Sequence, residues 1–188
     1  AHPSHTTNAR WYGVALPDFI SSYAPYQAQP ELYALARLEA LLNDAFDEAD
    51  TPPLAMEDLS RFLPEQFASL SFTPHPSVHR MNADFDLNAL WSALDPPTDP
   101  ASQQSAPSLE LLPGAQALLI WRQDLTSRFR VLDPQEAMMW DEAAKGVSFG
   151  VLCEMLAMYD EPESAPLRAA THLQAWIAGG LLAHVTLT

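Results

Sequence analysis

The sequence predicts an α+β fold, with helices in its first half and a small β-sheet with further helices in its second half. Two observations carry this prediction. Apolar residues recur at helical spacing over residues 32–46, and Pro30 can occupy the first turn of that helix. Residues 117–122 and 128–132 form two short apolar or alternating runs on either side of a tight turn, which is typical of a hairpin.

The first half contains further elements around the long helix. Residues 9–23 have an amphipathic pattern, and Thr51-Pro52-Pro53 ends the long helix. Residues 56–61, 64–70 and 87–94 favour short helices. Residues 70–81 favour extended chain, because a residue that precedes a proline avoids the helical region.

A Pro- and Ser-rich stretch divides the chain. Residues 95–108 contain no large apolar side chain, which is typical of a flexible loop or linker. We therefore expect a mainly helical region over 1–94 and an α+β domain over 109–188. In the second part the hairpin is followed by expected helices over 134–145, 148–159 and 163–178 and a closing strand over 181–187. This order is winged-helix-like.

The composition limits the kinds of molecule that the protein is expected to bind. The chain of 188 residues carries a net charge of −15, from 9 basic and 24 acidic residues. This charge repels nucleic acid and anionic lipid, and it favours a basic partner. No apolar run is long enough to span a membrane. The single cysteine, Cys153, excludes an intrachain disulfide, so we expect a buried structural thiol in a cytoplasmic protein.

One motif suggests a hydrolase. Gly146-Val147-Ser148-Phe149-Gly150 matches G-x-S-x-G, and Asp160 and then His172 or His184 follow in the required order. The nucleophile elbow needs a strand before the serine, whereas a helix is expected there. Gly146 is better explained as a helix end and Ser148 as a helix cap. We therefore expect no catalytic residue in this chain.

Metal ligands lack a suitable spacing. His75 and His79 lie in an extended segment, where a strand rise would separate them by about 13 Å. The sequence contains no Glu-x-x-His motif and no second cysteine for a zinc site. We therefore expect neither a metal site nor a cofactor of its own.

The hairpin is the candidate binding element. Arg122, Arg128 and Arg130 are three of the nine cations, and they fall within nine residues. Either they lie on a solvated strand face, or they flank a sheet edge that accepts a peptide strand. A winged-helix order also raises the alternative of a DNA-binding transcriptional regulator. The helix expected over 148–159 would read the bases, but it contains no Lys or Arg.

An ordered set of short motifs is similar to a known family. It comprises Arg37-Leu38-Glu39, His75-Pro76-Ser77-Val78, Ile120-Trp121-Arg122, Arg130-Val131-Leu132 and Gly146-Val147-Ser148. From Trp11 onward the chain resembles the HvfC/BufC family, which includes a methanobactin biosynthesis protein. The resemblance implies a non-catalytic partner of a multinuclear non-haem iron oxidase. In such a heterodimer the other subunit binds the iron, and this subunit presents a ribosomal precursor peptide whose Cys residues are modified.

The resemblance also implies where the peptide binds. The peptide-binding part of the family is similar to a RiPP recognition element, which has a winged-helix fold. We expect a basic leader peptide to bind beside five residues, namely Arg122, Arg128, Phe129, Arg130 and Phe72. We expect His75, Ser77 and Trp121 at the interface with the oxidase, with a core-bracing role as the alternative for His75 and the preferred one for Trp121.

Overall fold

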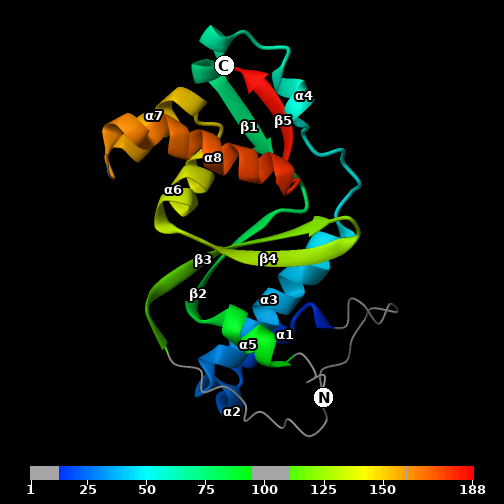
Figure 1. Ribbon diagram of the computed structural model, residues 1–188. Coiled ribbons are helices and arrows are strands. Elements are labelled where there is room, and N and C mark those ends of the chain that lie inside the picture. Colours follow the sequence, from blue (N-terminus) through cyan, green and yellow to red (C-terminus); the bar gives the residue numbers. More distant parts are fainter. Residues whose placement is uncertain (1–12, 95–110, 160) are drawn as a thin grey trace, which may run out of the picture.

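The computed structural model describes residues 13–94, 111–159 and 161–188, which form an α+β fold as predicted (Figure 1). The first range contains α1 (Leu16–Ser22), α2 (Ala24–Gln27), α3 (Pro30–Asp47), α4 (Met56–Leu59), η2 (Pro64–Ser69), β1 (Leu70–Pro74), β2 (His79–Phe85) and α5 (Leu87–Leu94). The rest contains β3 (Leu111–Gln123), β4 (Thr126–Leu132), α6 (Pro134–Ala143), α7 (Phe149–Ala157), η3 (Pro162–Ser164), α8 (Ala165–Ala178) and β5 (Leu182–Leu187). The long helix, the hairpin and the closing strand lie where the sequence predicts them, whereas the extended chain expected over 70–81 divides into β1 and β2, which belong to different sheets.

The strands form two antiparallel sheets. One has the order β2-β3-β4, and the other pairs β1 with β5 in the register Leu70↔Leu187. Strands that precede residue 95 therefore pair with strands that follow residue 110 in both sheets. The expected linker over 95–108 lies outside the described residues. The predicted division at this linker accordingly separates segments that share both sheets.

The three-stranded sheet is buried on both faces. Side chains alternate across a strand, so Leu118 and Ile120 of β3 pack into a cluster with α3 and α5, whereas Leu119 and Trp121 pack into a second cluster. The second cluster also contains Trp140 of α6 and Trp176 of α8. Figure 1 shows α3 and α5 on one side of the sheet and α6 and α8 on the other. This explains the apolar run over residues 117–121, which has no polar face.

Local features set several boundaries. The β3–β4 turn consists of Asp124 and Leu125, with φ of 50° and 60°. A two-residue hairpin turn of type I′ requires positive φ at both of these positions. Asp133 caps α6 by accepting hydrogen bonds from the backbone nitrogens of residues 135 and 136. Gly146 follows α6 with φ of 84°. Ser148 occupies the position before α7, but its side chain makes no capping hydrogen bond.

Among the described helices, none is both long and apolar enough to cross a membrane.

Candidate functional site

The outer edge of β4 is an open strand edge. β4 pairs with β3 on one side, and no strand in the described part of the chain pairs with its other side. A strand edge of this kind presents unpaired backbone N–H and C=O groups, which can bind another extended chain. β4 is therefore the first candidate for a binding element.

A hollow of about 340 Å³ lies at the same edge, lined by Leu42, Trp91, Trp121, Ser127, Arg128 and Phe129. Its walls come from different elements that tertiary contacts hold together. The Trp91 and Phe129 rings meet edge to face, with centroids 5.7 Å apart. The Ser127 hydroxyl donates a 2.7 Å hydrogen bond to the backbone oxygen of Leu42. These contacts join β4 to α3 and α5 and give the hollow an apolar side.

The three hairpin arginines have different environments. Arg122 donates to the backbone oxygen of Phe46 and to the Asp50 carboxylate, each at 2.8 Å, so it joins β3 to the end of α3. Arg130 donates to both carboxylate oxygens of Glu136. Arg128 is exposed, and it makes no ion pair with any described residue. Only one of the three predicted cations is thus directed to solvent.

The two phenylalanines predicted to bind the peptide have different positions in the structure. Phe129 lines the hollow beside β4. Phe72 lies in β1, is 3% exposed, and packs against Phe149 with ring centroids 6.3 Å apart. The structure therefore places Phe129 with Arg128 at the edge of β4, and Phe72 in the core on β1 of the two-stranded sheet.

His75, Ser77 and Trp121 are buried in the chain itself. His75 Nε2 lies 2.8 Å from the backbone oxygen of Thr51, which can only accept, so this nitrogen carries the proton. His75 Nδ1 then accepts from the Ser77 hydroxyl at 2.9 Å, and that hydroxyl accepts from the Arg122 backbone nitrogen at 3.3 Å. This chain of bonds ties residue 51 and the crossover between the sheets to β3. The predicted contact of these residues with an oxidase remains a prediction.

Glu136 is the centre of a buried polar cluster. Its carboxylate accepts from Arg130 of β4 and, at 2.8 Å, from Trp176 Nε1 of α8. Asp133, Glu136 and His172 offer possible metal-ligand atoms that lie within 4.8 Å of one another. The guanidinium of Arg130 already neutralises Glu136, and Asp133 is engaged as the cap of α6. We therefore interpret the cluster as a structural tie between β4, α6 and α8.

The G-x-S-x-G motif lacks the elbow geometry. Helix α6 precedes Ser148, where the hydrolase motif needs a strand. Gly150 has a packing reason, because a Cβ atom there would lie 3.0 Å from the backbone oxygen of Ala68 in η2. Asp160 lies outside the described residues. The motif is thus explained by the packing of α7 on η2.

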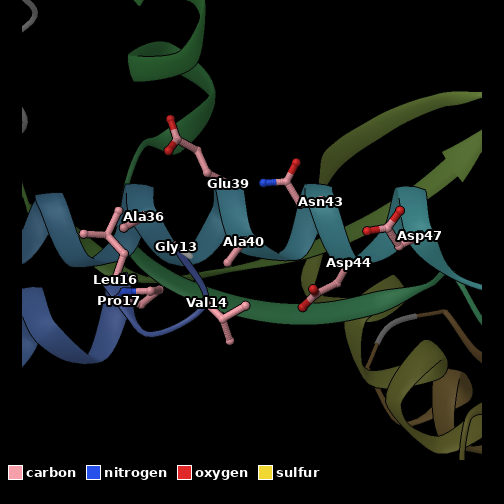
Figure 2. A pocket seen from close by; sticks show the side chains of 10 residues that line it. All are labelled: Gly13, Val14, Leu16, Pro17, Ala36, Glu39, Ala40, Asn43, Asp44 and Asp47. Carbon is pink, nitrogen blue, oxygen red and sulfur yellow. The ribbon is translucent and has the colours of Figure 1, made fainter. Parts of the chain in front are cut away.

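An acid-lined groove runs between α1 and α3. Its lining residues are Gly13, Val14, Leu16, Pro17, Ala36, Glu39, Ala40, Asn43, Asp44 and Asp47. Figure 2 shows Glu39 and Asn43 extending from one side of α3 and Asp44 from the other, with Val14 beneath the helix. No Lys or Arg is among the lining residues. The groove therefore has apolar walls and a negative rim, which favours basic side chains.

Sequence reasoning missed three residues of the hollow, namely Leu42, Trp91 and Ser127. Leu42 and Trp91 have the spacing of core residues in helices, and no local signal separates them from other apolar positions. No protein-family model matches the sequence, and no curated protein matches it. The resemblance to the HvfC/BufC family therefore remains a prediction based on the motifs.

Proposed function

We propose that the protein is a non-catalytic subunit that binds a ribosomal precursor peptide and presents its Cys-containing core to a multinuclear non-haem iron oxidase. The observation that carries this proposal is the open edge of β4 with an apolar hollow beside it. An extended peptide can add to such an edge through main-chain hydrogen bonds, while alternate side chains supply specificity. The leader of the precursor would be the added strand.

The order of elements after residue 110 supports the same proposal. A hairpin, helices α6 to α8 and the final strand β5 follow one another, which is the order expected of a winged-helix-like, RiPP recognition element-like domain. In this proposal β1 and β2 complete its sheets from the first half of the chain.

Charge supports a basic leader. The net charge of −15 attracts cationic peptides over long range, and the acid-lined groove between α1 and α3 offers carboxylates for basic side chains. The same charge disfavours the alternative of a DNA-binding regulator. Helix α7 would read the bases, and it contains no Lys or Arg. We therefore do not propose a DNA-binding function.

The oxidation belongs to the other subunit in this proposal. The family resemblance implies that the oxidase binds the iron, and we expect this chain to bind no cofactor of its own. Its contribution is positional, because holding the precursor near the iron raises the effective concentration of the Cys-containing core. The oxidase interface would include the surface near the crossover that contains His75 and Ser77.

Reconstitution tests the proposal. The purified oxidase is incubated with the full-length precursor peptide, with and without this protein, and the mass of the Cys-containing core is followed. We expect modification only when this protein is present, and co-elution of the two proteins on size exclusion. Modification at the same rate in its absence would contradict the proposal. A fluorescein-labelled random DNA duplex, titrated at low salt, should show no binding.

A further inference from the structure

We infer that the peptide segment that pairs with β4 carries a large apolar side chain, which enters the hollow, next to an acidic side chain, which faces Arg128. This inference rests on the proposed strand addition at β4. It specifies which side chains the edge of β4 selects. At Arg128 the edge favours an acidic side chain, whereas the net negative charge of the whole chain favours a basic peptide.

The two faces of β4 differ in chemistry. Ser127 and Phe129 point toward α3 and α5, because the first donates to the backbone oxygen of Leu42 and the second packs against Trp91. Arg130 points toward α6, where it meets Glu136. Side chains alternate along a strand, so Arg128 shares the face of Arg130. An added strand must alternate in the same way.

The first face selects an apolar side chain. The hollow is open to solvent, and its apolar walls on this face are Leu42, Trp91 and Phe129, while Trp121 and the long side chain of Arg128 line it from the other face. Complete burial of a large apolar side chain gives about 10- to 100-fold in affinity. The hollow is open on one side, so we expect the lower end, about tenfold for Phe over Ser.

The second face selects an acidic side chain. Arg122 and Arg130 already have carboxylate partners within the chain, whereas Arg128 has none among the described residues. Opposite charges on neighbouring strands are favourable and like charges are unfavourable, so we expect about 3- to 10-fold between Asp and Lys at this position. The long-range attraction of the acidic chain for cations is screened by salt, so the measurement belongs at about 0.15 M salt.

The test uses four fluorescein-labelled peptides of nine residues. Each has alternating Thr and Val, with Phe or Ser at the centre and Asp or Lys beside it. Polarisation is measured with the full chain and with the variants Arg128→Glu, Trp91→Ala and Leu42→Phe, whose folding is checked by circular dichroism. Arg37→Glu, on the exposed side of α3, is the control that changes the net charge equally.

We expect the Phe-Asp peptide to bind most tightly. Trp91→Ala and Leu42→Phe should each reduce the preference for Phe over Ser, one by removing a wall and the other by narrowing the hollow. Arg128→Glu should reverse the preference for Asp over Lys, and Arg37→Glu should leave that preference unchanged.

The contrary outcomes are separable. Equal affinity for all four peptides, with β4 amides protected from hydrogen exchange, would overturn the inference and leave strand addition intact. Absence of β4 protection with these peptides and with the precursor itself would overturn the strand addition too. A dimeric free chain whose β4 amides are already protected would assign the edge to a second copy and would overturn the inference.

Discussion

The substitution Glu136→Ala tests the tie that holds β4 against the helices. Its carboxylate is 6% exposed and bonds to Arg130 and to Trp176, so its loss leaves a guanidinium and an indole N–H without a partner. Breaking a buried charge pair from one side destabilises a protein by about 3–5 kcal/mol. Arg130 is 34% exposed and water can reach it, so we expect the lower end, about 3 kcal/mol.

Thermal and urea unfolding, followed by circular dichroism, measure this loss. For a chain of this size, about 3 kcal/mol lowers the Tm by about 6–12 °C. Glu136→Gln should have a smaller effect, since its amide oxygen can still accept from Trp176. Glu142→Gln is the control, because Glu142 pairs with Lys145 at the surface. A loss below about 1 kcal/mol for Glu136→Ala, the value of an exposed pair, would refute the reasoning.

Other predictions follow from single contacts. Leu125→Gly should raise the free energy of unfolding by about 0.5–1 kcal/mol, because the exposed Leu125 has φ of 60°, a value that glycine adopts without strain. An unchanged or lower Tm would contradict this. Arg122→Ala should lower the free energy of unfolding by about 1–2 kcal/mol, because it removes the hydrogen bond to the backbone at the end of α3. Asp50→Ala, at an exposed carboxylate, should change the free energy of unfolding little, and equal effects of the two variants in urea unfolding would contradict this. Burial raises the pKa of the Cys153 thiol, so alkylation by iodoacetamide at neutral pH should be slower than that of a free thiol. Because the folded pKa is raised, any stability linked to the neutral thiol is lost as the pH rises through that pKa.

Local sequence signals predicted the elements well. As predicted, Pro30 begins α3 and Gly146, with positive φ, follows α6, whereas the predicted cap Ser148 precedes α7 without a capping hydrogen bond. Each of these effects acts over a few residues, so the chain contains the information in one short segment. The hairpin around Asp124 and Leu125 was visible for the same reason.

The pairing of strands that are distant in the chain could not be predicted from the sequence. β1 pairs with β5 across more than a hundred residues, and no local pattern specifies that register. The hairpin arginines show the same limit. Arg130 meets Glu136 six residues away, whereas Arg122 meets Asp50 across 72 residues, so arginines that are close in sequence have partners at very different sequence distances.

The hollow beside β4 has no sequence signature, since residues of α3, α5, β3 and β4 together line it. Leu42 and Trp91 occupy positions that helical periodicity assigns to the core. Phe129 was identified because it lies in the hairpin. The prediction thus found the strand that forms the edge and missed the helices that give the edge its apolar pocket.

Hydrogen exchange of the β4 amides, with and without the precursor peptide, tests the central claim most directly. Strand addition forms main-chain hydrogen bonds along the outer edge of β4, so alternate amides over residues 126–132 should exchange more slowly when the peptide is bound. The amides of β5, in the other sheet, serve as the internal control. Peptide binding with unchanged exchange over residues 126–132 would contradict the claim that β4 receives the peptide.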